Sequence, residues 1–247
     1  MIYRLLAAVV LFLTLSPSME ARQRGQRGGP PPTPRAGAPI DLTGYWVSIV
    51  TEDWRWRMVT PPKGDVLSIP VNPEGRRVAG MWDPATDAAA GNPCKAYGAA
   101  GIIRIPGQLH ITWLDDNTLK VETEAGTQTR QFRFGNPQPQ GEPSLQGHSV
   151  GLWERAGTRG SNTPGGNLKV VTTRLRPGYL RKNGVPYSEN TVLTEYYHHM
   201  VQPDGVPWLV VITTVEDPTY LAQPYVLTTQ FKKVPDASAN WTPTPCS

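Results

Sequence analysis

From residue 102 onward, apolar and polar residues alternate in short runs that are separated by turn-forming residues. The first reversals fall at 106–107, 115–117 and 125–126, where Pro-Gly, Asp-Asp-Asn and Ala-Gly favour tight turns. Short runs of this kind at regular spacing predict β-strands. The expected strands are 102–105, 109–114, 118–124, 127–134, 148–154, 168–176, 191–201, 207–216 and 225–232.

The chain before residue 102 is less regular. A β-branched run at 47–50 predicts the first strand, and the Trp-Arg alternation within 51–60 predicts a second strand with a Trp face and an Arg face. The segment 73–82 opens with proline and predicts one short helix. Residues 85–101 are small and turn-rich, so we expect an irregular loop there.

So many short strands must close into a barrel or pack as two layers, because open sheet edges promote aggregation. Gly44-Tyr45-Trp46, at the head of the first strand, is similar to the Gly-x-Trp signature of lipocalins and other calycin barrels. That resemblance implies that Trp46 plugs one barrel end, with Lys232 and Lys233 placed to pack over it. The expected fold class is therefore mostly β: an antiparallel calycin-like barrel or β-sandwich with one short helix.

A second resemblance covers most of residues 66–246. The motifs that carry it are Pro73-Glu74-Gly75-Arg76, Asp83-Pro84, Cys94, Gly147-His148-Ser149-Val150-Gly151-Leu152-Trp153-Glu154, Leu168-Lys169-Val170-Val171-Thr172 and Glu216-Asp217-Pro218. Through these motifs the chain resembles an uncharacterised family of exported bacterial β proteins, and this resemblance implies a secreted β fold without naming a reaction.

The N-terminus has the order of a secretory signal peptide. Arg4 precedes an apolar run from Leu5, and small residues follow up to Ala21. The apolar run is too short to span a bilayer, which takes about 20 residues. We expect a signal peptide at 1–21, a disordered Gly/Pro/Arg-rich linker at 22–40 and a single β domain at 41–247. The expected location is periplasmic or extracellular, with no stable membrane insertion after signal cleavage.

The charge is concentrated outside the predicted domain. The formal net charge is +4, but residues 41–247 hold 19 basic and 19 acidic side chains. Nucleic-acid binding needs a clustered basic face, and a neutral domain offers none, so no nucleic-acid partner is expected. Cys94 and Cys246 are the only cysteines, and in an oxidising compartment they are expected to form a disulfide.

Two motifs match known catalytic or metal-binding patterns, but the predicted strands around them do not give the structural context that those functions need. Gly147-His148-Ser149-Val150-Gly151 matches the nucleophile elbow of α/β-hydrolases, but a strand pattern follows where the elbow needs a helix. His198-His199 suggests a metal site, yet adjacent strand residues point to opposite faces. No metal and no cofactor is therefore expected.

A hairpin at Asp204-Gly205 gives the most specific site hypothesis. A two-residue turn there pairs Glu195 with Thr214 and His199 with Val210, which places Trp208 and Tyr197 on one apolar face. Carboxylates and an imidazole on such a face are candidates for acid and base chemistry. The candidate catalytic residues are Glu195, His199, Glu216, His148 and Asp217.

Most of the candidate ligand-binding residues come from the hairpin and from the Trp-rich segment, and Arg174 comes from the strand predicted at 168–176. Trp54, Trp56 and Trp82 with Arg55 and Arg57 suggest a stacking platform, although tryptophan is more often a core residue. The full candidate ligand-binding set is Trp208, Tyr197, Trp54, Trp56 and Arg174.

These features favour an exported lipocalin-like protein that binds a small, partly apolar or aromatic molecule inside the barrel. Two alternatives remain open: a cofactor-independent exported hydrolase or isomerase that uses the Glu/His/Asp constellation, and an envelope structural or interaction module. Whether the chain is an enzyme, and its oligomeric state, are left open.

Overall fold

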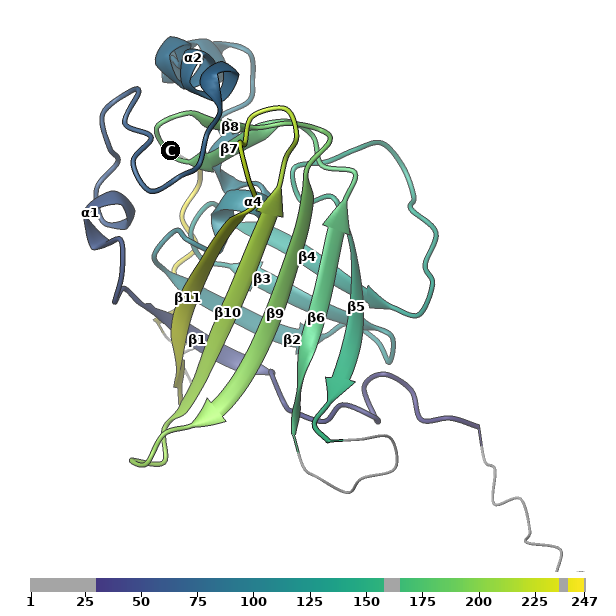
Figure 1. Ribbon diagram of the computed structural model, residues 1–247. Helices are drawn as coiled ribbons and strands as arrows, with labels where there is room; N and C mark the ends of the chain where they lie inside the picture. The colour runs from purple at the N-terminus through teal and green to yellow at the C-terminus, as the bar shows by residue number, and fades with distance from the viewer. Residues whose placement is uncertain (1–29, 158–164, 236–239, 247) are drawn as a thin grey trace, which may run out of the picture. The chain divides into compact units, whose positions relative to one another are not determined.

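The computed structural model describes residues 30–157, 165–235 and 240–246. Within the unit Pro32–Ser247, nine strands form a closed barrel in the order β1-β11-β10-β9-β6-β5-β4-β3-β2, and β2 pairs back to β1 (Figure 1). The mostly β class and the barrel are thus confirmed. The strands are β1 (Gly44–Ile49), β2 (Gln108–Trp113), β3 (Thr118–Thr123), β4 (Gln128–Phe134), β5 (His148–Arg155), β6 (Gly166–Thr173), β9 (Val192–Val201), β10 (Pro207–Glu216) and β11 (Tyr225–Val234).

One pair of barrel strands breaks the expected antiparallel pattern. β4 and β5 run parallel, with Phe132 opposite Ser149. Parallel neighbours cannot be joined by a tight hairpin and need a connection of about a dozen residues. The Pro-, Gln- and Gly-rich segment 135–147 supplies this connection.

The barrel strands alternate in burial with the period of two expected for a closed sheet with one interior. On β9, Leu193, Glu195 and Tyr197 are fully buried, while Thr194 and Tyr196 between them are half-buried on the outer side. Apolar residues at every second position therefore fix which face of each strand turns inward.

The Trp-Arg alternation within 51–60 does not form the predicted strand; it forms the helical turn α1 (Trp54–Arg57). Asp53 adopts a left-handed backbone conformation with φ 51°, which turns the chain away from β1, and its carbonyl accepts from the Arg57 amide. The local alternation of residue types was misleading because tertiary contacts, rather than a pleated surface, hold these side chains.

Residues 84–102 are more helical than expected. The predicted helix after Asn72 is present as α2 (Pro73–Met81), but the expected irregular loop contains α3 (Pro84–Ala89) and the 3₁₀ turn η1 (Lys95–Tyr97). The predicted strand 102–105 is also wrong, because α4 (Ala99–Ile102) and the turn after it occupy that stretch. Its apolar run is buried by packing on neighbouring elements, and burial alone does not distinguish a strand from a helix end.

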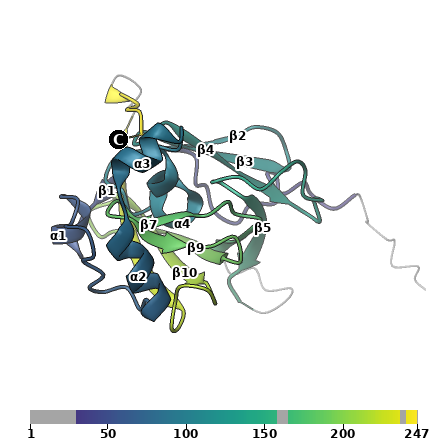
Figure 2. The same cartoon turned by 90° about the horizontal axis from the view of Figure 1, so that it is seen from above.

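These helices cover one end of the barrel together with a two-stranded sheet that the sequence did not predict. The sheet pairs β7 (Gly178–Arg181) with β8 (Val185–Tyr187). Seen from above, α2, α3, α4 and β7 lie over the barrel opening (Figure 2). Gly184 makes the turn between the two strands at φ 80°, and a Cβ there would lie 2.0 Å from the Trp82 ring. Only glycine fits this contact.

Trp46 is fully buried near the opposite end of the barrel. Its indole Nε1 donates to the Leu42 carbonyl at 2.8 Å, and the Lys233 ammonium lies 5.3 Å from its ring centroid. Lys233 therefore packs over Trp46 as the Gly-x-Trp resemblance implied.

Part of the segment expected to be a disordered linker contacts the barrel. The Trp153 indole donates to the Pro34 carbonyl at 2.8 Å, and Arg155 donates to the carbonyl of Gly37. These carbonyls are satisfied by barrel side chains, a contact that composition alone did not reveal. The predicted signal peptide at 1–21 lies outside the described residues.

The expected disulfide between Cys94 and Cys246 is present, with the two Cα atoms 5.2 Å apart. It ties the C-terminal segment to the chain just before η1, beside the helical end of the barrel. Among the helices described, none is long and apolar enough to cross a membrane.

Candidate functional site

The barrel interior is filled by side chains, including a polar layer between two apolar clusters. Leu193 belongs to the cluster near the helical end and Tyr197 to the cluster near Trp46, with Glu195 between them on β9. Other strands contribute buried polar groups beside Glu195. These groups are Arg130, Ser149, Thr172, Thr213 and Thr229, each at most 4% exposed.

Arg130 and Glu195 form a two-pronged ion pair at the centre of this layer. Arg130 Nη1 donates to Glu195 Oε1 at 2.9 Å, and Nη2 donates to Oε2 at 2.6 Å. Tyr197 donates its hydroxyl to Glu195 Oε1 at 3.3 Å. The nearby Glu195 carboxylate holds the pKa of Arg130 above its usual value despite complete burial. Glu195, a candidate catalytic residue, is therefore fully engaged inside the protein.

The other candidate catalytic residues have separate partners. Asp217 is buried and accepts from Ser188 and from the Thr219 amide, while Glu216 beside it is exposed. His148 Nε2 lies 3.2 Å from the Pro137 carbonyl oxygen. Among the described residues, no hydrogen bond or ion pair joins any two of the five candidates.

His199 lies near Trp46, at the end of the barrel away from the helices. The two rings meet edge to face with centroids 5.9 Å apart. Partial burial, and then the Lys233 ammonium, lower the pKa of His199 below its usual value. Within the described ranges no group of three His, Cys, Asp or Glu side chains is placed to hold a metal.

The predicted hairpin register is wrong by one residue. Trp208 pairs with Met200 and Val211 with Tyr197, because the turn contains three residues, 203–205, rather than two. The Gln202 amide donates to the Val206 carbonyl, and Gly205 supplies a positive φ of 80°. A one-residue shift moves every side chain to the other face. Trp208 therefore does not share the inward face of Tyr197.

The remaining candidate ligand-binding residues are dispersed. Trp54 is 67% exposed on α1. Arg174 adopts φ 54°, donates to the Gly141 carbonyl at 2.7 Å and lines an outer cavity of about 250 Å³ together with His148. Trp56 lines a different cavity, at the helical end of the barrel, where the richest arrangement of charged and aromatic side chains lies.

This cavity, which we call the cationic pocket, has a volume of about 50 Å³. It lies between α1, the turn after α4, β7 and the start of β11, and its walls combine apolar and aromatic surface with cations. The side chains used below are Trp56, Arg57, Arg104, Arg181, Lys182 and Tyr225.

Arg104 is tied into the pocket wall by acceptors from two sides. It forms ion pairs with Glu52 and Asp53, and its Nη1 donates to the Thr228 carbonyl at 2.8 Å. Glu52 also accepts from the Thr228 hydroxyl at 2.8 Å. The carboxylates of Glu52 and Asp53 are therefore both ion-pair partners of Arg104.

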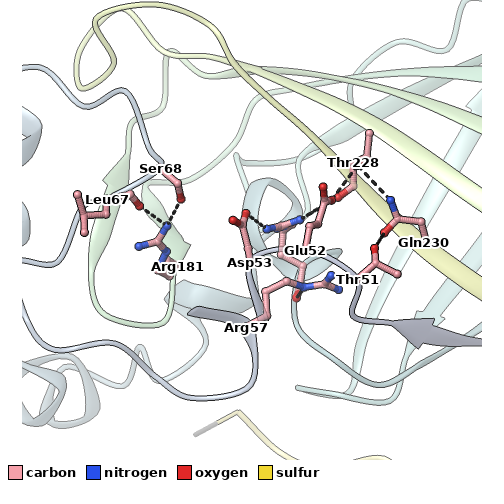
Figure 3. Close-up of polar contacts among 10 residues, drawn as sticks. Thr51, Glu52, Asp53, Arg57, Leu67, Ser68, Arg181, Thr228 and Gln230 are labelled. Carbon is pink, nitrogen blue, oxygen red and sulfur yellow. Dashed lines mark hydrogen bonds and ion pairs between the residues drawn. The ribbon is translucent and has the colours of Figure 1, made fainter. Parts of the chain in front are cut away.

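Arg181 is held by the segment that follows α1. Its Nη2 donates to the Leu67 carbonyl at 2.8 Å and to the Ser68 hydroxyl at 3.0 Å (Figure 3). Its guanidinium lies 5.4 Å from the Trp56 ring centroid, within cation–π distance. Trp56 in turn donates to Asp65 at 3.2 Å. Arg181 thereby fixes the aromatic wall of the pocket.

Arg57 differs from both of these arginines. Its Nε donates to the Arg104 carbonyl at 3.0 Å, but neither Nη has a hydrogen-bond partner among the described residues, and both atoms are buried. Burial, and then the Arg104 charge, lower the pKa of Arg57 to about 10. A buried cation without an acceptor is costly, so an anion in the pocket would be stabilised there.

A second, larger cavity adjoins the cationic pocket; we call it the aromatic cleft. Its volume is about 470 Å³, and it shares Thr60, Ala96 and Lys182 with the pocket. Trp82 and Tyr179 contribute its aromatic surface. The two cavities are therefore neighbours, and both lie outside the barrel interior.

Tyr179 is positioned in the aromatic cleft by a short polar chain. Its hydroxyl donates to Asp87 Oδ2 at 2.6 Å, and Lys95 donates to Asp87 Oδ1 at 2.5 Å. Partial burial and the Asp87 carboxylate raise the pKa of Tyr179, so the phenol stays neutral at physiological pH. Its ring is thus a fixed, uncharged wall.

Sequence reasoning found only part of this site. The Trp-Arg platform included Trp56, Trp82 and Arg57, which do line the two cavities. Arg104, Arg181 and the other lining residues were missed, because they come from segments far apart along the chain and carry no local motif.

No family model matches this chain, and neither a curated protein nor a solved structure with significant similarity to it was found. The closed barrel is the class of fold that the chain adopts, and the function has to be argued from the site itself.

Proposed function

We propose that this chain is an exported small-molecule-binding protein built on a lipocalin-like barrel, with its binding site at the helical end of the barrel rather than in its interior. The observation that carries the proposal is that the cationic pocket and the aromatic cleft lie side by side and share Thr60, Ala96 and Lys182 in their linings. Ligand sites are typically concave and mostly apolar, with a few convergent polar groups.

The packing of the barrel interior supports a binding site outside it. The side chains that project into the barrel from β9 and β10 are close to fully buried, and Arg130 and Glu195 form an ion pair with two hydrogen bonds at the centre. Opening this layer to a ligand would separate a buried ion pair, which is strongly unfavourable.

The export proposal is supported by the disulfide. Disulfides persist mainly in oxidising compartments, and Cys94–Cys246 is consistent with a periplasmic or extracellular location. The proposed ligand is a small, partly apolar or aromatic molecule, as the aromatic walls of the cleft favour.

Native mass spectrometry of the protein purified from its own host, combined with a thermal-shift screen of small molecules, tests this function. We expect a bound or bindable small molecule that raises the melting temperature by several degrees. If neither method finds such a molecule, the binding function is wrong.

A pair of neighbouring variants tests the location. Ala88 lines the aromatic cleft from α3 and is exposed, so Ala88→Trp should fill the cleft without disturbing the fold. Ala89 is exposed on the same helix but is not among the residues described as lining the cleft, so Ala89→Trp is the matched control. We expect binding to be lost in the first variant and kept in the second. Equal binding by both would place the site elsewhere.

A further inference from the structure

The donor atoms of the cationic pocket identify the chemistry of the group it would receive. Arg104 already donates to Glu52, Asp53 and a backbone carbonyl, and Arg181 donates to two backbone carbonyls and a hydroxyl. Arg57 lines the same pocket with both Nη atoms buried and without an acceptor in the described part of the chain. The guanidinium donors of the pocket that lack an acceptor are therefore the two Nη groups of Arg57.

A single planar fork matches a carboxylate. The two Nη groups of an arginine can donate in parallel to the two oxygens of a carboxylate, which gives a charge-assisted, two-bond contact. A phosphate would bring up to two negative charges and further oxygens, and the neighbouring guanidinium donors are already engaged. The pocket volume of about 50 Å³ leaves space for only a few water-sized groups.

A carboxylate in a pocket of this size leaves the rest of the ligand outside it, and the aromatic cleft is the neighbouring cavity. The boundary that the two cavities share consists of Thr60, Ala96 and Lys182. The cleft has a volume of about 470 Å³ and is lined by Trp82 and Tyr179, whose neutral rings suit an apolar body.

We propose that the ligand is an amphiphilic monocarboxylic acid: its carboxylate accepts from both Nη atoms of Arg57, and its aliphatic or aromatic body lies between Trp82 and Tyr179. This inference rests on the proposed binding function and names the ligand class of the same site.

Isothermal titration of the disulfide-bonded chain tests the ligand class directly. The panel consists of benzoate, 3-phenylpropionate, octanoate and decanoate, the primary amide of each acid, and phenyl phosphate. We expect at least one acid to bind, at least tenfold more tightly than its amide and more tightly than phenyl phosphate. An amide that binds as well as its acid, tighter binding of phenyl phosphate, or binding by none of the four acids overturns the carboxylate assignment.

Variants of the arginine test the contact. Arg57→Gln should weaken the best acid at least tenfold while leaving its amide unaffected, and Arg57→Lys should keep part of the affinity because it retains the charge without the fork. Arg76→Gln, which removes an exposed arginine on α2 outside both cavities, should change nothing. If Arg57→Gln binds the acid like the unmodified chain, the contact is wrong. The acid–amide comparison needs no variant and remains decisive if Arg57→Gln does not fold.

The outcomes separate this inference from the proposed function. Small molecules that bind in the cleft, are blocked by Ala88→Trp and show no preference for a carboxylate would leave the binding function intact and remove the ligand class. Absence of any bound or bindable molecule would remove both.

Discussion

Arg130 in the barrel and Arg57 at its helical end show two ways of burying a guanidinium. Arg130 is 1% exposed and meets both oxygens of Glu195, whereas Arg57 is only partly buried but has two Nη atoms without an acceptor in the described chain. A buried charge is tolerated when the fold supplies its partner. In the interior the fold supplies a carboxylate for the buried charge, although Arg130 Nε has no hydrogen-bond partner among the described residues; at the helical end it supplies no acceptor for the Nη atoms of Arg57.

Removal of Glu195 should give the largest effect. Glu195→Ala leaves the Arg130 charge buried without its partner, and we expect the free energy of unfolding to fall by about 3–5 kcal/mol. Chemical denaturation measures this loss. The double variant Arg130→Met/Glu195→Leu should recover most of it, because an apolar pair needs no charge compensation. A single variant as stable as the unmodified chain would show that the interior does not depend on this pair.

The opposite result is expected for Arg57. Arg57→Met removes a cation that lacks an acceptor, so without ligand the variant should be more stable by about 0.5–1 kcal/mol, allowing for the partial exposure of the side chain. The melting temperature without ligand measures this gain. The melting temperature with ligand measures the stabilisation by ligand, which the variant should lose. A destabilised variant would mean that Arg57 is already satisfied in the empty protein.

The smallest effect concerns His199, at the far end of the barrel from Arg57. Its pKa is lowered in the folded state, so the unfolded chain takes up a proton first as the pH falls below about 6.5. Stability from this group is complete above that pH and is lost as the pH falls through the lower, folded-state pKa. His199→Gln should therefore lose less stability between pH 7 and pH 5, by less than about 1 kcal/mol because the imidazole is partly exposed. Parallel pH curves for the two proteins would contradict this.

The sequence was informative wherever burial alternates strictly. The strands from β2 to β6 and β9 to β11 lie close to their predicted ranges, because a two-residue period and turn-forming residues are local signals. The Gly44-Tyr45-Trp46 motif also indicated correctly that a lysine would pack over Trp46.

The helical end and the register were beyond such local signals. A third turn residue shifted the predicted β9–β10 pairing, and α1 forms because Asp53 turns the chain, which the Trp-Arg alternation did not reveal. The cationic pocket gathers Arg57, Arg104 and Arg181 from three distant segments. Only the tertiary fold creates this neighbourhood, so the sequence analysis named Trp56 and Arg57 of the pocket and Trp82 of the adjoining cleft without predicting where they lie together.

The position of β1 has a consequence for the order of folding. This first strand is the seam of the barrel, since it pairs with β2 on one side and with β11 on the other, where Tyr45 lies opposite Val234. When the chain is synthesised from its N-terminus, the edge of β1 that pairs with β11 stays unpaired until nearly the whole chain has emerged. Contacts of such long sequence separation form slowly. Cys246 lies later still, so the covalent link to Cys94 can only seal a barrel whose last strand has already arrived.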